Sequence, residues 1–260
     1  MGIQLAVQSG IYGYGIFGRR AEKDLEGTLS MVKAAGYDGV EVMSSLTKDP
    51  KQLNECCVRH GLSIVALHLF WEEIRKNPPW AVLATLDTAR LIISGLPLVT
   101  EADLHEALDP LCDLAEEAAN RGVRVLVHNH AEECAPFDNG LTPLEILVES
   151  TDDDYIGFVV DLHWAAVAGE VERTIKTTSR RCDYYHIKDG SLTNPNCDES
   201  YDLGSGEVDL HHAWGLIRRH HETVAAVVAE RSMPAGDLAH ALAHDAWFIR
   251  DLVGTDGDTP

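Results

Sequence analysis

The chain has 260 residues, of which 45% are apolar and 24% charged, a composition typical of a globular protein with one large domain or two small ones. Asp and Glu number 42 against 21 Lys and Arg, and this net charge of −21 argues against DNA and anionic membranes as partners, because both are bound through cationic contacts. No apolar run approaches the roughly 18 residues of a membrane span, and MGIQLAVQSG at the start lacks a basic signal-peptide region. Six scattered cysteines without a CxxC pair do not predict a disulfide framework. We therefore expect a cytoplasmic protein.

Short apolar segments alternate with amphipathic segments along the chain. The apolar segments have the length and composition of strands buried on both faces, and the amphipathic ones repeat at helical spacing. The expected strands are residues 3–8, 37–43, 62–68, 96–100, 123–130, 155–161, 182–188 and 223–230. The expected helices are residues 21–35, 50–60, 80–94, 102–121, 142–150, 170–181, 209–220 and 237–252.

These elements form eight strand–helix units, without a sequence repeat or an interdomain linker. Alternating strands and helices predict a parallel sheet covered by helices, and eight units favour closure of that sheet. The length also agrees with the roughly 250 residues of a βα barrel. The sequence thus predicts a single (β/α)8 TIM barrel over residues 1–252, followed by a disordered tail at 253–260. The fourth strand, 96–100, is the weakest, and without it an open sheet remains an alternative.

Ionisable side chains gather at the C-terminal ends of the predicted strands, where βα barrels have their active sites. They are Glu41, His68, His128, His130, Glu133, Asp161, His163, His186, Lys188 and Glu230. Taken singly, each has a structural interpretation, such as a helix cap for an aspartate or a surface ion pair for Lys188 with Asp189.

Three of these residues end consecutive strands, which makes a metal site the better interpretation. Asp161, His186 and Glu230 end the sixth, seventh and eighth strands and should converge at the mouth of the barrel. Charges buried there require a counter-charge, which a divalent cation supplies. Imidazole and carboxylate ligands suit manganese, magnesium, zinc or cobalt.

Several motifs, in order and on the expected strands, resemble those of a known family. They are KAAGYDGVEV (33–42), HNHAEE (128–133), VVDLHWAAVAGE (159–170), HIKDG (186–190) and LGSGEVD (203–209). Together they resemble the xylose isomerase-like TIM barrels, the sugar phosphate isomerase/epimerase superfamily, which includes ketose epimerases, inosose dehydratases and apurinic-site endonucleases. The resemblance covers most of the chain.

The resemblance implies one divalent metal ion, manganese before zinc, magnesium or cobalt, held by Asp161, His186, Glu230 and a ligand from the fifth strand. That ligand is either His128, which stands where many members have a glutamate, or Glu133. Epimerases of the family use the glutamates of strands five and eight as an acid/base pair, and His128 leaves that mechanism open. A second departure is Trp164, where the family has a histidine.

The implied reaction is proton transfer next to a metal-polarised carbonyl. The candidate catalytic residues are Glu133, Glu230, His128 and Lys188, and the candidate substrate contacts are His68, Trp71, His130, Trp164 and Glu41. We expect an isomerase or epimerase of a sugar, cyclitol or keto-sugar. A lyase on the same scaffold, such as an inosose-type dehydratase or a keto-glycoside-cleaving enzyme, is the first alternative, and a non-catalytic barrel that serves as a binding or complex subunit is the second.

An apurinic-site endonuclease is disfavoured, because the negative charge does not fit a groove for nucleic acid. The glycines of LGSGEVD precede a helix and can hold a phosphate through backbone N–H groups, but a tight turn is the simpler interpretation. A homo-oligomer is expected by analogy alone.

Overall fold

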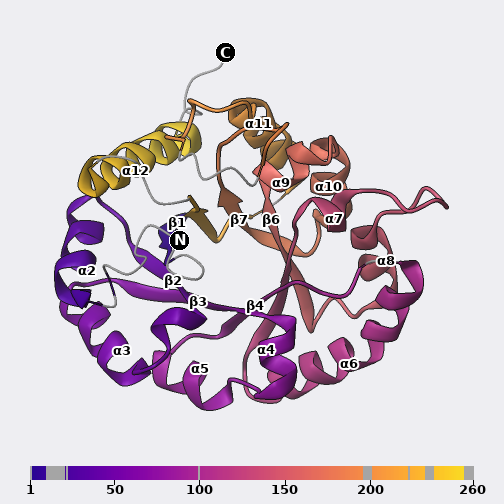
Figure 1. The fold of residues 1–260 in the computed structure, drawn as a ribbon, viewed down its shortest axis with the longest axis horizontal. Helices are drawn as coiled ribbons and strands as arrows, with labels where there is room; N and C mark the ends of the chain where they lie inside the picture. Colours follow the sequence, from indigo (N-terminus) through magenta and orange to yellow (C-terminus); the bar gives the residue numbers. More distant parts are fainter. Residues whose placement is uncertain are drawn as a thin grey trace.

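Eight parallel strands close into a barrel in the computed structural model, which describes residues 2–9, 21, 23–98, 100–195, 201–221, 223–231 and 237–254. The strands follow one another around the barrel in chain order, and β1 pairs with β8 to close it. Figure 1 looks along the barrel and shows the helices as a ring around the strands. The strands are β1 Gln4–Gln8, β2 Gly39–Met43, β3 Ser63–Phe70, β4 Arg90–Ser94, β5 Arg124–His128, β6 Ile156–Asp161, β7 Cys182–Ile187 and β8 Ala226–Ala229.

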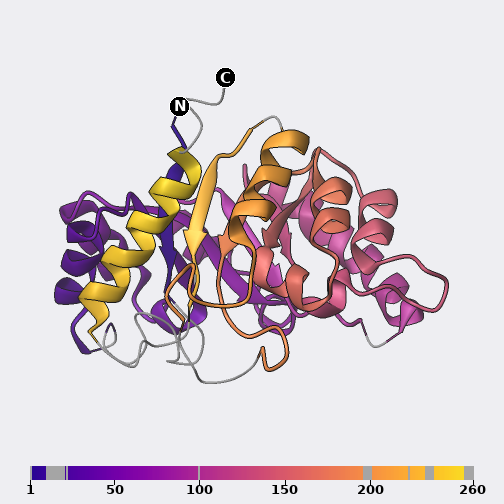
Figure 2. The same ribbon diagram turned by 90° about the horizontal axis from the view of Figure 1, so that it is seen from above.

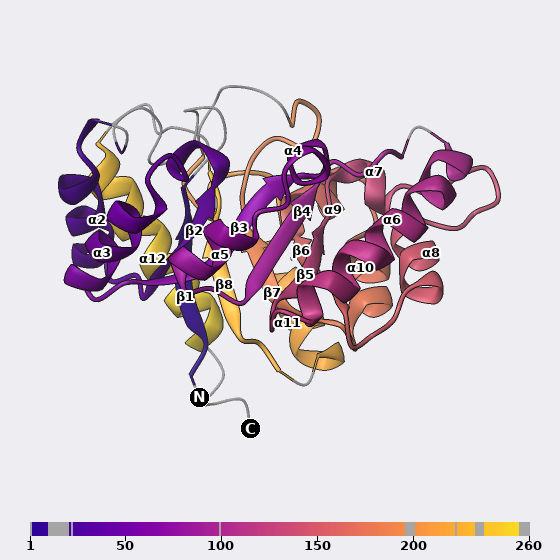
Figure 3. The same ribbon diagram turned by 90° about the horizontal axis from the view of Figure 1, so that it is seen from below.

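The outer ring consists of long helices that lie along the strands, as Figure 2 shows for α11 and α12. They are α2 Leu25–Ala34, α3 Pro50–Arg59, α5 Trp80–Leu86, α6 Glu101–Ala119, α8 Pro143–Ser150, α10 Val171–Thr178, α11 Leu210–His220 and α12 Leu238–Gly254. Among the described residues, three short α-helices follow strands, α4 Trp71–Lys76, α7 Ala131–Cys134 and α9 Leu162–Val167, and the 3-10 helix η1 Ser44–Leu46 follows β2. Figure 3 shows α4 and α7 at the edge of the barrel where their strands end. The sequence pattern did not predict these three helices, which are shorter than the window that reveals helical periodicity.

Strand alternation places an apolar layer inside the barrel and a polar layer next to it. The inner layer consists of Ala6, Val65, Ala66, Ile92, Leu126, Val159, Tyr184, Ala226 and Val228. Because successive side chains of a strand point to opposite faces, the residue two positions later points inward again. On seven strands that residue is polar: Gln8, His68, Ser94, His128, Asp161, His186 and Glu230. On β2 Glu41 follows Gly39 in the same way.

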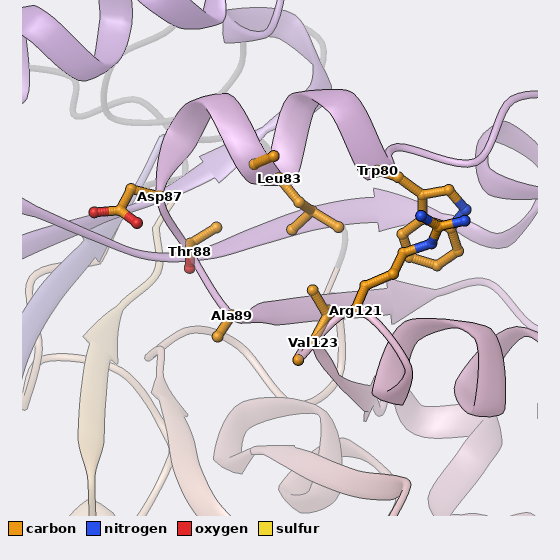
Figure 4. Close-up of a pocket in the computed structure, with 9 residues that line it drawn as sticks. Trp80, Leu83, Asp87, Thr88, Ala89, Arg121 and Val123 are labelled. Carbon is orange, nitrogen blue, oxygen red and sulfur yellow. The ribbon is translucent and has the colours of Figure 1, made fainter.

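The helix predicted at residues 80–94 is confirmed only as far as Leu86, and the rest of the prediction for residues 80–100 was wrong. Figure 4 shows α5 ending at Asp87 and the chain passing Thr88 and Ala89 toward β4. Asp87 has a positive φ of 52°, and its N–H donates to the carbonyl of Leu83 to close the last helical turn. The next residues, Arg90–Ser94, pair with β3 and β5 and form the fourth strand. A short apolar run fits either a helix or a strand, and pairing on both sides decided for the strand.

The segment expected as the fourth strand, 96–100, instead links β4 to α6. Its last residue, Thr100, caps α6, because its hydroxyl accepts the backbone N–H of Asp103 at 3.2 Å. The last helix, α12, extends to Gly254, two residues beyond the prediction, and residues 255–260 of the expected tail lie outside the described residues. Among the described helices, none combines the length and the apolar character needed to cross a membrane.

Candidate metal centre and active site

Each strand brings one polar side chain to the C-terminal end of the barrel, and each of these side chains lies beside at least one other. The eight residues are Gln8, Glu41, His68, Ser94, His128, Asp161, His186 and Glu230. Four of them form a group whose candidate ligand atoms all lie within 4.8 Å of one another: His128, Asp161, His186 and Glu230. The strand register explains part of this arrangement, because Asp161 of β6 lies directly beside His186 of β7. The structure therefore brings together the three residues that the sequence pattern predicted to converge, and adds His128 from β5.

Three atoms of this group are buried without a hydrogen-bond partner among the described residues. They are His128 Nε2, Asp161 Oδ2 and His186 Nδ1. His128 Nε2 is 3.7 Å from Asp161 Oδ2, which is too far for a hydrogen bond. His186 Nδ1 is 2.9 Å from Glu230 Oε2, but the two are not aligned as a hydrogen bond. Buried polar atoms without partners are rare and costly, and two imidazole nitrogens with carboxylate oxygens are a ligand set that divalent metals accept. The residues present thus fit a divalent metal ion.

Glu41 anchors a second group on the neighbouring strands, and its carboxylate is fully engaged. Oε1 lies 2.8 Å from His68 Nδ1 and accepts Gln8 Nε2 at 3.1 Å. Oε2 lies 2.8 Å from His186 Nε2 and accepts the hydroxyl of Tyr184 at 2.8 Å. A carboxylate has about four acceptor positions, and these four neighbours fill them. The Glu41 carboxylate is therefore satisfied without a metal ion.

Ser94 connects this group to the candidate ligands. Its Oγ lies 2.6 Å from His68 Nε2 and 3.2 Å from His128 Nδ1. Gln8 makes a second connection, because its Nε2 also donates to Glu230 Oε2 at 2.8 Å. Both imidazoles of the candidate metal group therefore have one nitrogen in the network and the other facing the site.

The charges of the site perturb several pKa values in opposite directions. Burial raises the pKa of Glu41, but the charge of His186 and its hydrogen bonds outweigh burial and lower this pKa far below 4.5. Burial lowers the pKa of His186, but the charge of Glu41 and the contact with Glu230 raise it to about 10. Burial and then the charge of Glu230 raise the pKa of Asp161. The Asp161 carboxylate thus lacks a sufficient counter-charge.

Lys188, Trp164 and His130 form one side of the site. Lys188 Nζ lies 3.3 Å from Glu230 Oε1 and 5.0 Å from the ring centroid of Trp164. The ring of His130 lies 5.4 Å from that of Trp164 and 5.0 Å from that of His128. Burial and then the charge of His128 lower the pKa of His130 to about 4, so His130 is neutral at pH 7. His163, one residue before Trp164, is buried and packs beside it.

Two other predicted site residues have structural contacts. The Glu133 carboxylate accepts the backbone N–H of His130 at 2.7 Å and thereby caps α7. Glu133 is not part of the four-residue group. Burial raises its pKa to about 7, against the hydrogen bond from His130. Trp71 begins α4, is 2% exposed, and packs in the hydrophobic core with the Arg75 guanidinium over its ring.

The glycine-rich loop LGSGEVD forms a turn around Asp189. The backbone N–H groups of Gly204 and Gly206 both donate to Asp189 Oδ2 at 2.9 Å. A Cβ on Gly206 would lie 2.2 Å from Asp189 Oδ1, so this position requires glycine. Because Asp189 occupies these donors, the loop does not offer them to a phosphate, and the turn interpretation is confirmed.

The sequence reasoning missed three residues of the site: Gln8, Ser94 and Tyr184. Gln8 ends an apolar strand, and this signal was available in the sequence. Ser94 was hidden because its strand was taken for a helix. Tyr184 lies in the inner apolar layer, and only the structure shows its hydroxyl reaching Glu41.

The cavity in Figure 4 is unrelated to these residues. It measures about 360 Å³ and lies between α5, the residues before β4 and the residues that follow α6. Its lining includes Trp80, with the Arg121 guanidinium 5.3 Å from the ring centroid. Residues before a strand lie at the N-terminal end of the barrel, so this cavity is at the end opposite to the candidate metal group.

Comparisons with known proteins show the fold. No family model matches the chain, and no curated protein matches it in sequence. Among solved structures, a sugar phosphate isomerase/epimerase from Parabacteroides distasonis superposes with a TM-score of 0.75 at 17% identity over 96% of each chain. The 3-keto-D-glucoside 4-epimerase YcjR from E. coli has a TM-score of 0.71 at 16% identity, over 96% of this chain and 99% of that one.

The IOLI protein, in a structure with a binding zinc atom, has a TM-score of 0.73 at 17% identity, over 99% of this chain and 100% of that one. At these identities the likeness concerns the fold. This chain has the fold of the xylose isomerase-like and sugar phosphate isomerase/epimerase barrels, as the sequence resemblance predicted.

Proposed function

We propose that this protein is a divalent-metal-dependent isomerase or epimerase that acts on a sugar, cyclitol or keto-sugar. The observation that carries the proposal is the buried group of His128, Asp161, His186 and Glu230, with three unpaired atoms at the C-terminal end of a barrel. The sugar epimerases of the same fold support the substrate class. Zinc in the IOLI structure supports a divalent ion without selecting among zinc, manganese, magnesium and cobalt.

A divalent ion held by His128, Asp161, His186 and Glu230 would supply the polarisation of the substrate carbonyl that makes the adjacent C–H more acidic. Glu230 removes or returns that proton through its Oε1, the oxygen next to Lys188. Lys188 stabilises the negative charge that develops on the substrate oxygen. Trp164 and His130 contact the substrate, with the indole ring against an apolar face of the sugar.

A lyase reaction is the second candidate, and the position of Glu133 favours it. Epimerisation requires proton transfer on both faces of the substrate carbon, and a second carboxylate opposite Glu230 would serve that role. In this structure the Glu133 carboxylate caps α7 and stands outside the four-residue group. Elimination requires only one base and an acid that assists the leaving group, which Glu230 and Lys188 can supply.

The first experiment is metal analysis by elemental mass spectrometry on protein purified without chelator. The test variant is Asp161→Asn/Glu230→Gln, which keeps the side-chain volumes, and the control is Asp113→Asn/Glu116→Gln on the exposed face of α6. We expect about one divalent ion per chain in the wild type and the control, and none in the test variant. Absence of metal from the wild type, even after incubation with divalent ions, would refute the proposal and favour a non-catalytic barrel.

The reaction type is then tested with keto-sugars in heavy water. An isomerase or epimerase incorporates solvent deuterium next to the carbonyl and conserves the mass of the substrate otherwise. A lyase instead releases water or the glycosidic group, which mass spectrometry detects as a smaller product.

A further inference from the structure

We propose that Glu41, His68 and Ser94 form a directed hydrogen-bond chain that sets the tautomers of both imidazole ligands. This inference rests on the proposed function, because it concerns the nitrogens that His186 and His128 present to a metal. All members of the chain are buried, and each is 2% exposed or less.

The direction of the chain starts at Glu41, because a carboxylate only accepts hydrogen bonds. The two ring nitrogens next to it, His186 Nε2 and His68 Nδ1, both at 2.8 Å, must therefore carry protons and donate. A metal-bound imidazole has one N–H, which it donates to a neighbouring acceptor. When a metal ion replaces the second proton of the His186 cation, the N–H that remains is the one at Nε2 that donates to Glu41, and Nδ1 presents its lone pair to the site.

The same logic carries the direction through His68 to Ser94. With its proton on Nδ1, His68 accepts a hydrogen bond through Nε2, which lies 2.6 Å from Ser94 Oγ. The Ser94 hydroxyl has a single proton and donates it to His68. Ser94 Oγ then has only lone pairs left for its second neighbour, His128 Nδ1 at 3.2 Å.

The chain ends at His128 with the outcome that a metal site requires. His128 Nδ1 must donate to Ser94, so the lone pair of His128 lies on Nε2. The two nitrogens that this argument leaves to a metal ion, His128 Nε2 and His186 Nδ1, are those that have no hydrogen-bond partner among the described residues. One carboxylate on β2 thus prepares ligands on β5 and β7.

Glu41 can set this direction because donors fill all its acceptor positions. Gln8 and Tyr184 occupy the positions not taken by the two histidines, at 3.1 and 2.8 Å. Neither oxygen therefore has a remaining position for a metal. Glu41 and Ser94 are positioning residues in this scheme and do not contact the substrate.

The test uses protein with isotope-labelled histidine nitrogens, loaded with NMR-active cadmium as the metal probe. We expect scalar coupling from cadmium to His186 Nδ1 and His128 Nε2. Coupling to the opposite nitrogen of either ring would overturn the inference. A wild type that binds no cadmium would refute the proposed function itself, so the two failures are distinguishable.

Two variants test the origin of the direction. Ser94→Ala removes the acceptor for His128 and the donor to His68, and it leaves the contact of His186 with Glu41 in place. We expect about tenfold weaker cadmium binding, with a loss of the preference for the Nδ1–H tautomer of His128 in the metal-free protein. Glu41→Gln replaces one carboxylate oxygen, an acceptor, with an amide N–H₂ group, a donor. We expect the affinity for cadmium to fall by a factor approaching 100. Ser150→Ala and Glu116→Gln on exposed helix positions are the matched controls and should bind as the wild type does.

Circular dichroism and thermal melting establish that each variant is folded before the comparison is made. Wild-type affinity in both folded variants would overturn the inference. If Glu41→Gln does not fold, the Ser94→Ala variant still tests the inference. A His128 that keeps its Nδ1–H tautomer in that variant would overturn the inference.

Discussion

The two halves of the barrel use the same position on each strand in opposite ways. Strands β1 to β4 contribute Gln8, Glu41, His68 and Ser94, which hydrogen-bond to one another. Strands β5 to β8 contribute His128, Asp161, His186 and Glu230, and three of these four have an unpaired buried atom. The side chains of the first half satisfy one another, whereas the second half has buried atoms that no hydrogen bond satisfies.

This difference separates a candidate metal site from a structural polar cluster when both contain histidine and carboxylate. Glu41, His68 and His186 also form a group with metal-binding geometry. However, each carboxylate oxygen of Glu41 already has two partners at 2.8 to 3.1 Å. Residue type and proximity are shared by the two groups, and only the unpaired atoms separate them.

The largest expected effect comes from the second half. Asp161→Asn keeps the oxygen that caps α9 at 2.9 Å but removes the ligand charge. We expect the metal to be lost and the rate of the keto-sugar reaction to fall by more than about 1000-fold, equivalent to about 4 kcal/mol of barrier. Steady-state kinetics with added metal measures this effect. Activity near that of the wild type would show that Asp161 is not a ligand.

Lys188→Met should separate substrate chemistry from metal binding. The methionine keeps the contact with Trp164 but removes the charge 3.3 Å from Glu230. We expect kcat to fall about 100-fold, about 2.7 kcal/mol, because a charge that stabilises the transition state is removed. Elemental analysis should show the wild-type metal content. Loss of the metal together with the rate would place Lys188 in the support of the ligands instead.

Glu133 gives a pH-dependent prediction. Its pKa is raised by burial to about 7, above the ordinary value of 4.5, so the folded protein binds the proton more tightly than the unfolded chain. The resulting stability is fully present below about pH 4.5 and is lost as the pH rises to about 7, by about 1 to 3 kcal/mol. Urea unfolding across this range measures the loss.

Glu133→Gln is the matched variant, because its amide oxygen can still accept the N–H of His130. The variant should lack this part of the pH dependence and retain its metal. If its metal content falls to zero, Glu133 reaches the ion in solution, and the ligand from the fifth-strand region is Glu133 instead of His128.

The smallest expected effect is on the free energy of unfolding of the metal-free protein, which should rise for a variant in the second half of the barrel and fall for a variant in the first half. Asp161→Asn removes an unpaired buried charge and should stabilise the metal-free fold by about 1 to 2 kcal/mol. Tyr184→Phe removes a hydrogen bond to Glu41 and should destabilise it by about the same amount. Chemical denaturation after chelation measures both. The same sign for both variants would contradict the distinction between a closed network and an open site.

Much of this architecture could be predicted from the sequence because strand alternation is local. On six strands the polar residue at the C-terminal end could be recognised, because an apolar run stops there. These residues are Glu41, His68, His128, Asp161, His186 and Glu230. The fourth strand could not be recognised, because Arg90–Ser94 has the length and apolarity of either element, and its partners lie far away in the chain, as Leu67 on β3 and Val125 on β5 do for Leu91. With that strand misplaced, Ser94 was lost from the site.

The sequence by itself determined the barrel, the end of it that carries the polar residues, and the three residues Asp161, His186 and Glu230 that meet there. These depend on the period of two in a strand and on the order of the βα units, which are properties of the chain pattern. Only the tertiary structure decided which polar atoms find partners. The difference between Glu41 and Asp161, and between the two nitrogens of His186, depends on the distance and the alignment of side chains that come from different strands. No local pattern in the sequence encodes such distances.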